Sequence, residues 1–225
     1  MSTTRVYLVR HGATTVTAED RFAGSTDVEL SDEGRQQAQA LGRRLASVPL
    51  SQIYSSPMKR AVSTATYIAE PHRLVPTEIW ALHEVDHGRW EGRTRDEAAR
   101  EFPEEFAAWT EDPFRCAPEG GESGVQVMAR ALAAMRTIVE RDRGQTIAVV
   151  SHKATIRLLV CAWLGIDARG YRDRMDQSPA ALNALDFKDP TQARLLLFND
   201  ISHYSDSPLL EHPRLSPVWT AAAPN

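Results

Sequence analysis

The chain lacks most of the features that mark a secreted or membrane protein. Only two cysteines, Cys116 and Cys161, occur among its 225 residues, too few for the disulfide framework of a secreted domain of this size. The N-terminus reads Met-Ser-Thr-Thr-Arg-Val-Tyr and has neither the apolar stretch nor the cleavage site of a signal peptide. No apolar run reaches the length that spans a bilayer. We therefore expect a soluble, cytoplasmic protein with reduced cysteines and no membrane contact.

Positive charge is also scarce. The chain has 26 lysines and arginines against 30 aspartates and glutamates, a formal net charge of −4. This balance excludes the basic surface expected of a nucleic-acid-binding protein. Only three of the 26 basic residues are lysines, Lys59, Lys153 and Lys188, so 23 are arginines. A small anionic substrate is still allowed, because its binding depends on local charge rather than on net charge.

The composition is that of a globular domain. Hydrophobic residues make up 42% and charged residues 25% of the chain, which argues against disorder and predicts one domain over residues 1–204. Residues 205–225 form a proline-containing tail that we expect to be loosely attached.

Strands and helices alternate along the predicted domain. The clearest strands are the apolar runs Val6–Val9 and Ile147–Val150. Further strands are predicted at 53–54, 182–187 and 195–198, and helices from Ser31 through Leu45, from Ser56 to before Pro71, between Gly121 and Gly144, and over Ile156–Leu164. This order predicts an α/β fold.

Each of the two clearest strands ends in a histidine, His11 after Val6–Val9 and His152 after Ile147–Val150. The carboxyl ends of strands in an open α/β sheet form the ligand crevice. Either histidine alone is more readily explained as a structural residue. Two histidines in equivalent settings, with Arg10 beside one of them, instead favour an anion-binding site.

Five groups of motifs follow one another along residues 5–165. They read Leu8-Val9-Arg10-His11-Gly12; Arg21-Phe22-x-Gly24 with Leu30-Ser31-x-x-Gly34-x-x-Gln37-Ala38; Tyr54-Ser55-Ser56-Pro57-x-x-Arg60-Ala61-x-x-Thr64-Ala65; Leu82-His83-Glu84 with Gly88-x-Trp90-Glu91-Gly92; and Gly120-Gly121-Glu122-Ser123 with Val149-Val150-Ser151-His152. In this order they resemble the histidine phosphatase superfamily, the phosphoglycerate-mutase-like enzymes. The resemblance implies a three-layer sandwich with a mostly parallel central sheet flanked by helices.

The resemblance also implies roles for five residues. His11 would attack phosphorus and form a phosphohistidine, because neutral imidazole is nucleophilic near pH 7; its other ring nitrogen would be held by an acceptor such as a backbone carbonyl. Arg10, Arg60 and His152 would bind the phosphoryl oxygens. Glu84 would protonate the leaving alkoxide and later activate water. Its apolar neighbours Trp80, Leu82 and Trp90 predict a dry pocket around the carboxyl group.

Two positions depart from the family's commonest pattern, and they add weaker candidates for substrate binding. The stretch Ala13-Thr14-Thr15-Val16-Thr17 replaces Glu-Thr-x-x-Asn, so the Thr17 hydroxyl stands where an amide is common. Lys153 follows His152 where a glycine is frequent, and its ammonium either meets the substrate or points to solvent. Ser25 is the third candidate of this kind.

A zinc site is the rival interpretation of one segment. His83-Glu84-Val85-Asp86-His87 matches His-Glu-x-x-His, the zinc hydrolase pattern. That pattern needs both histidines on one face of a sustained helix together with a third ligand. Pro76 and Gly88 limit such a helix, and no third ligand lies at a recognised spacing. We therefore expect no metal and no other cofactor.

The sequence predicts a phosphatase that acts on a small phosphate monoester. A phosphoglycerate mutase with the same phosphohistidine is the alternative, disfavoured by the short and acidic stretch between Glu84 and His152. A catalytically inactive phosphate-binding scaffold is the third possibility, and the intact set of five residues argues against it. The substrate is not identified, and the oligomeric state is left open, with a homodimer as one option.

Overall fold

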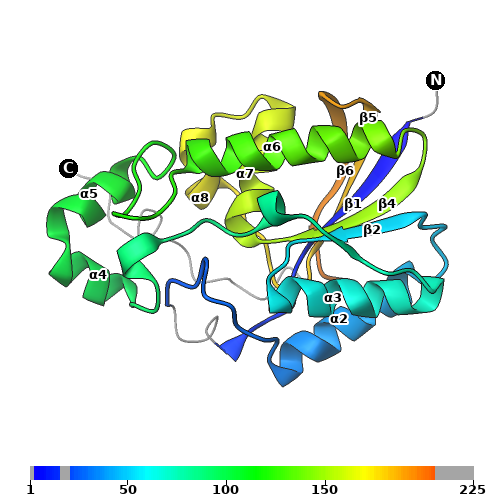
Figure 1. The fold of residues 1–225 in the computed structure, drawn as a ribbon, viewed down its shortest axis with the longest axis horizontal. Coiled ribbons are helices and arrows are strands. Elements are labelled where there is room, and N and C mark those ends of the chain that lie inside the picture. The colour runs from blue at the N-terminus through cyan, green and yellow to red at the C-terminus, as the bar shows by residue number, and fades with distance from the viewer. Residues whose placement is uncertain (1–2, 16–20, 206–225) are drawn as a thin grey trace.

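The computed structural model describes residues 3–15 and 21–205 of the chain (Figure 1). Thr17 and almost all of the predicted tail lie outside these residues. Within them, no helix is both long enough and apolar enough to cross a membrane.

A mixed sheet of six strands forms the centre of the described structure, in the order β3-β2-β4-β1-β5-β6. Its strands are β1 (Thr4–Arg10), β2 (Gln52–Ser55), β3 (Thr77–Glu78), β4 (Thr146–Ser151), β5 (Leu182–Asp189) and β6 (Gln192–Asp200). Strands β1 to β4 are parallel to one another, whereas β5 runs antiparallel to both β1 and β6. Both predicted late strands are confirmed as the hairpin β5–β6.

Helices cover both faces of this sheet, as Figure 1 shows. The longer helices are α2 (Asp32–Leu45), α3 (Lys59–Ala69), α6 (Gly124–Arg141) and α7 (Lys153–Leu164); the shorter ones are α4 (Arg95–Glu101), α5 (Pro103–Glu111) and α8 (Tyr171–Arg174), with 3₁₀ turns at Glu70–His72, Trp80–Leu82, Gly88–Trp90 and Ala168–Gly170. The predicted α/β sandwich is confirmed. Helix α3 starts at Lys59, three residues after the predicted start at Ser56.

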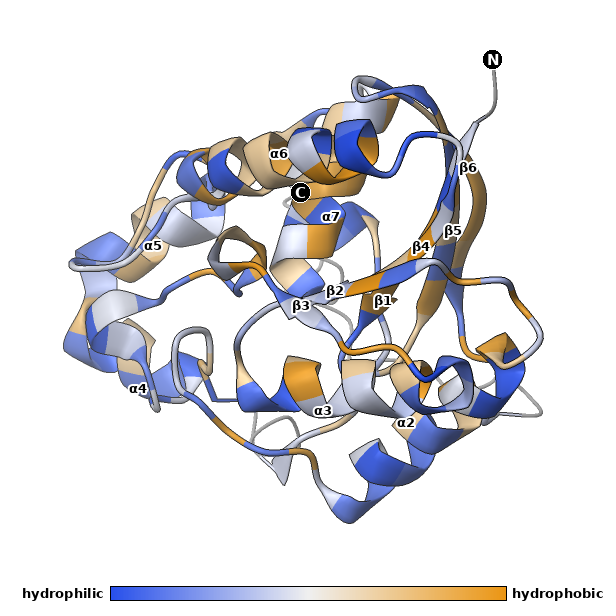
Figure 2. Cartoon of the chain, turned by 45° about the vertical axis from the view of Figure 1, so that its right-hand side comes forward, coloured by the Kyte–Doolittle hydropathy of each residue, from blue (hydrophilic) through white to orange (hydrophobic). Residues whose placement is uncertain are grey.

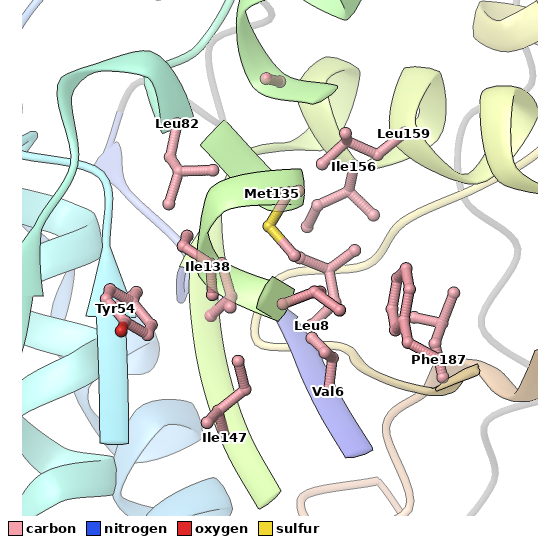
Figure 3. Packing of buried hydrophobic residues seen from close by; sticks show 14 of the residues in the cluster. Val6, Leu8, Tyr54, Leu82, Met135, Ile138, Ile147, Ile156, Leu159 and Phe187 are labelled. Atoms are coloured by element: carbon pink, nitrogen blue, oxygen red, sulfur yellow. The ribbon is translucent and has the colours of Figure 1, made fainter. Parts of the chain in front are cut away.

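Alternation along the strands divides the core into two layers. Val6 and Leu8 of β1 pack with Met135 of α6 and Ile156 of α7, as the close view in Figure 3 shows. Val9 of the same strand packs on the opposite layer, under α2 and α3. Because successive side chains of a strand point to opposite faces, an entirely apolar run is buried on both sides. Figure 2 shows the apolar sides of these helices turned toward the sheet.

Helices α4 and α5 contribute to an aromatic cluster of their own, distinct from the two layers of the main core. Phe22, Trp90, Ala98 and Trp109 are its buried members. Helix α4 begins with a complete capping box, in which Thr94 and Glu97 each bind the other's backbone N–H, as their spacing predicts. Helices α4 and α5 lie to the left in Figure 1. They are beside the end of the sheet at which β1 and β4 lead into His11 and His152.

Candidate active site

The two histidines meet where β1 and β4 end. Arg10 pairs with Ser151 in the parallel register of these strands, and the His11 N–H donates to the Ser151 carbonyl at 3.1 Å. This register brings the two imidazole rings to a centroid distance of 5.0 Å. Both side chains are buried. The structure therefore brings together the two residues that the sequence placed at equivalent strand ends.

His11 is held in one orientation by its own neighbour. Its Nδ1 lies 2.7 Å from the Gly12 carbonyl oxygen, which can only accept, so Nδ1 carries the proton and Nε2 carries the free lone pair. Burial, and then the positive charges of Arg60 and Arg10, lower the pKa of His11 well below its usual value. Neutral imidazole is the nucleophilic form, so these surroundings favour attack by Nε2.

The loop that follows His11 depends on close backbone packing. A Cβ atom on Gly12 would lie 2.4 Å from the Gly34 carbonyl oxygen, a distance that side chains do not tolerate. The Gly12 N–H donates to the Thr64 hydroxyl at 3.1 Å, and this hydroxyl donates to the Arg60 carbonyl at 2.8 Å. The His11 loop and the start of α3 are therefore linked directly.

Arg10 is buried beside the same strand end. Its Nη1 donates to the Gln177 carbonyl, and its Nε is buried without a hydrogen-bond partner among residues 3–15 and 21–205. Burial, followed by the neighbouring Arg157 guanidinium, lowers the pKa of Arg10 to about 10. A buried donor of this kind is costly to leave unpaired, and an anion would pair it.

Arg60 is held by a loop rather than by a carboxylate. Its Nη1 donates to the Thr26 carbonyl at 2.8 Å, and its Nη2 donates to the Gly24 carbonyl at 2.8 Å. The side chain is buried, and burial lowers the pKa of its guanidinium. Carbonyl partners do not neutralise the guanidinium, so its charge stays available for an anion.

Glu91 organises that loop, a role that sequence reasoning missed. Its Oε1 accepts the N–H groups of Gly24 and Ser25, and its Oε2 accepts the N–H and hydroxyl of Thr26. Oε1 also accepts the His87 N–H. Burial raises the pKa of Glu91, but these hydrogen bonds outweigh it and leave the pKa below its usual value. Glu91 was visible in the motif Gly88-x-Trp90-Glu91-Gly92, but nothing local showed that it binds residues 65 to 67 positions earlier.

His152 presents the opposite ring nitrogen to its protein partner. Its Nε2 lies 2.7 Å from the Ser56 hydroxyl, and its Nδ1 is buried without a partner in the described part of the chain. Burial, followed by the neighbouring ring of His11 and the charges of Arg60 and Arg10, lowers the pKa of His152 well below its usual value. An acceptor such as a phosphoryl oxygen could pair Nδ1.

Glu84 lies at the first turn of α7. Its Oε1 accepts the N–H groups of Val85 and Thr155, and its Oε2 accepts the N–H of Ala154 at 3.1 Å. The predicted apolar pocket of Trp80, Leu82 and Trp90 is wrong for the two tryptophans, whereas Leu82 is buried in the main core. Trp80 is 72% exposed, and Trp90 belongs to the aromatic cluster under α4 and α5. Two backbone N–H groups in the first turn of α7 bind the carboxylate because the chain after β4 turns into a helix at this edge of the sheet.

The family of the chain follows from its match over residues 6–201 to the histidine phosphatase superfamily, branch 1. The chain belongs to this superfamily. The match covers both strand ends and all of the residues described above, so the resemblance seen in the motifs is confirmed.

Relatives of this histidine phosphatase include proteins named as phosphatases. It is 37% identical over 163 residues to phosphoserine phosphatase 1 of Hydrogenobacter thermophilus, covering 72% of this chain and 77% of the relative. It is 34% identical over 173 residues to glucosyl-3-phosphoglycerate phosphatase of Mycolicibacterium vanbaalenii, covering 74% and 76%. The solved structure of YhfR from Bacillus stearothermophilus is similar with a TM-score of 0.83 and 32% identity, covering 89% of this chain and 98% of that one. The family and these relatives support a phosphoric monoester hydrolase.

The three weaker candidates for substrate binding, Thr17, Ser25 and Lys153, differ in what the described residues show about them. Thr17 lies outside the described residues. The Ser25 hydroxyl donates to Asp86 at 3.2 Å, so its hydrogen is already used, although its loop carries the Arg60 contacts. Lys153 lies directly after His152, and its ammonium is 3.2 Å from an Asp176 carboxylate oxygen.

The His-Glu-x-x-His segment of this histidine phosphatase is not a helix. His83 follows one 3₁₀ turn and His87 precedes the next, so the two side chains do not share a helix face. The His83 ring instead contacts the Trp80 carbonyl and Glu122. No cluster of three or more metal-ligating side chains occurs in the described ranges.

Proposed function

We propose that the protein hydrolyses a small phosphate monoester in two steps, through a phosphohistidine on His11. The observation that carries this proposal is the hydrogen bond from His11 Nδ1 to the Gly12 carbonyl oxygen. It leaves Nε2 as the nucleophilic atom, in surroundings that keep the ring neutral. Arg10, Arg60 and His152 supply the donors that such a reaction needs around the phosphoryl group.

In the first step the lone pair of His11 Nε2 attacks phosphorus. An N–P bond forms, the ester P–O bond breaks, and the bonding pair moves to the leaving oxygen. Glu84 supplies a proton to that oxygen. Oε2 is the atom suited to this transfer, because it accepts one described hydrogen bond and keeps a second lone pair for the proton, whereas Oε1 accepts two backbone N–H groups.

In the second step water attacks the phosphohistidine. Glu84, now a carboxylate, removes a proton from the water, an O–P bond forms, and the N–P pair returns to Nε2. Inorganic phosphate leaves, and the proton on Glu84 restores the starting state. Arg10 and Arg60 bind the phosphoryl oxygens in both steps.

A rapid-quench experiment tests the nucleophile. Mixing wild-type protein with a ³²P-labelled ester and quenching under conditions that preserve phosphoramidates should trap one labelled site, which peptide mapping should assign to His11. Turnover with no trapped phosphoenzyme would contradict the assignment. Binding of phosphate without turnover on a broad panel of esters would support an inactive scaffold instead. Incubation with EDTA tests the zinc alternative, and we expect activity to survive it.

Glu84→Gln tests the acid. Alkyl phosphates need a proton on the leaving oxygen and should lose about 10²–10⁴-fold in kcat, whereas p-nitrophenyl phosphate, with its good leaving group, should lose much less in the phosphorylation step. Burst amplitude and single-turnover rates separate this step from hydrolysis of the phosphohistidine, which also needs Glu84. Equal losses in the rate of phosphorylation by both esters would show that Glu84 is not the general acid.

A mutase is the second candidate function, because it uses the same phosphohistidine but returns the phosphoryl group to a bound glycerate. Offering 3-phosphoglycerate with a bisphosphoglycerate primer distinguishes the two activities. Fast isomerisation with little free phosphate would overturn hydrolysis. A cytoplasmic location, a single domain ending at residue 204 and a homodimer remain proposals made from the sequence.

A further inference from the structure

Cations outnumber anions on the α7 side of the candidate site. The Oδ1 atom of Asp176 lies 3.2 Å from Lys153 Nζ and 3.0 Å from Arg157 Nη2, and it accepts the Gln177 N–H at 2.8 Å. Arg10 donates to the carbonyl of Gln177, the residue next to Asp176. The Asp176 carboxylate thus pairs with two cations, Lys153 and Arg157. The neighbouring backbone carbonyl accepts a hydrogen bond from a third cation, Arg10.

The positive charges of this group act on one another. Partial burial of the side chain, followed by the charges of Arg10 and Arg157, lowers the pKa of Lys153 to about 8. Two buried donors in the group, Arg10 Nε and Arg157 Nε, have no hydrogen-bond partner within the described ranges. Asp176 leaves a surplus of positive charge here, and unpaired buried donors favour the arrival of an acceptor.

Lys153 is the member of this group that a substrate can reach. Its side chain is 41% exposed, whereas that of Arg157 is 8% exposed. It directly follows His152, whose ring lies 5.0 Å from that of His11. Asp176 and the first turn of α7 restrain the lysine beside the phosphoryl site.

We propose that Lys153, supported by Arg157 and Asp176, binds a second anionic group of the substrate, so that the preferred esters carry a carboxylate or a second phosphate besides the ester phosphate. This inference rests on the proposed function. When a phosphoryl dianion is bound by Arg10 and Arg60, and Glu84 carries the proton for the leaving group, Asp176 is the carboxylate that pairs with Lys153 and Arg157, since Asp173, which also acts on Arg157, is paired with Arg172. A second anion on the substrate would take up that remaining charge, and a neutral substituent would not.

Matched pairs of esters test this inference. 3-Phosphoglycerate and glycerol 3-phosphate differ in a carboxylate that replaces a hydroxymethyl group; fructose 1,6-bisphosphate and fructose 6-phosphate differ in the second phosphate. We expect wild-type kcat/KM to be about tenfold to a hundredfold higher for the charged member of at least one pair. The pair that shows the preference identifies the anion. Added salt should reduce the preference, because it screens exposed charges.

Variants of Lys153 test whether this residue causes the preference for the ester with the second anionic group. Lys153→Met should reduce the ratio of kcat/KM within the preferred pair about tenfold or more, and Lys153→Arg should keep most of it. Lys188→Met, which removes an exposed lysine of β5, is the matched control and should leave the ratio unchanged. Circular dichroism and phosphoenzyme formation report whether each variant is folded and competent.

Failure of this inference differs from failure of the proposed function. Equal kcat/KM within both pairs, or an unchanged ratio in Lys153→Met, would overturn the inference while phosphoenzyme still forms from all four esters. Absence of a phosphoenzyme from every ester would overturn the proposed function and this inference together.

Discussion

The ends of β1 and β4 deliver the same residue type to the same place, and yet the two histidines present different atoms. His11 uses Nδ1 on the Gly12 carbonyl, and so Nε2 is left with a lone pair. His152 uses Nε2 on the Ser56 hydroxyl, and so Nδ1 is left unpaired among the described residues. Both rings are buried and close to Arg10 and Arg60. The comparison teaches that the partner of the second nitrogen, rather than the residue type or its depth, distinguishes the proposed nucleophile from the proposed binding group.

The first prediction removes the nucleophile. His11→Ala should lower kcat by on the order of 10⁴-fold or more, since it removes the Nε2 lone pair proposed to attack phosphorus. Steady-state kinetics and rapid quench measure the loss, with thermal denaturation as the check on folding. A variant that keeps a phosphoenzyme would show that the two histidines can exchange roles.

The second prediction removes the partner ring. His152→Ala should lower kcat by roughly 10²–10³-fold, the usual cost of losing one donor to a charged transition state. Phosphoenzyme should still form, but slowly, in single-turnover experiments. Loss of the covalent intermediate without unfolding would instead make His152 part of the nucleophilic machinery.

The third prediction concerns the protonation of the two histidines and the stability of the fold at acidic pH. Burial and the nearby arginines lower the pKa of both rings, so each should stay neutral at pH values where an ordinary histidine, with a pKa of about 6.5, is already protonated. Below pH 6.5 the unfolded chain binds protons that these folded residues do not. Stability should therefore fall as pH drops, by about 1.4 kcal/mol per pH unit for each histidine until its lowered pKa is reached.

Ring ¹⁵N NMR shifts followed against pH measure this third effect, assigned with His11→Asn and His152→Asn. A midpoint near 6.5 for the His11 signal would contradict the neutral state on which nucleophilic attack depends. Chemical denaturation at pH 7.0 and 5.5, in wild type and in each variant, separates the contributions of the two residues to the change in stability.

The smallest expected effect comes from Ser56→Ala. It removes the hydroxyl that holds His152 Nε2 and leaves His11 and its Gly12 contact untouched. We expect a loss of about threefold to tenfold in kcat/KM, the size of one neutral hydrogen bond, with phosphoenzyme still formed. A loss as large as that of His152→Ala would mean that His152 contributes to catalysis only when Ser56 orients its ring.

Much of the fold, and the position of the two histidines at strand ends, could be predicted from local sequence patterns. The fully apolar runs at 6–9 and 147–150 predict strands buried on both faces, and the histidines after them follow the general rule for parallel sheets. The spacing of Thr94 and Glu97 predicts the cap of α4, which the structure shows. These features depend on neighbours in sequence, and a single chain contains that information.

The contacts around the candidate site could not be predicted in the same way. Trp80 and Trp90 are close to Glu84 in sequence, yet the carboxylate binds the start of α7, 70 and 71 residues later. Glu91 and Arg60 meet the loop at 24–26 from two different elements. Such pairs form only when separate elements pack, because neither partner lies within a turn of the other.

By itself, the sequence determined the family and the α/β layering and predicted the residues proposed to carry the chemistry, because these depend on motif order and on hydrophobic periodicity. Only the tertiary structure decided which nitrogen of each histidine is left without a protein partner among the described residues, which oxygen of Glu84 accepts fewer hydrogen bonds, and that Lys153 shares one carboxylate with Arg157 beside Arg10. The physical reason is that protonation and hydrogen bonding respond to atoms within a few ångströms, and most of those atoms come from distant parts of the chain.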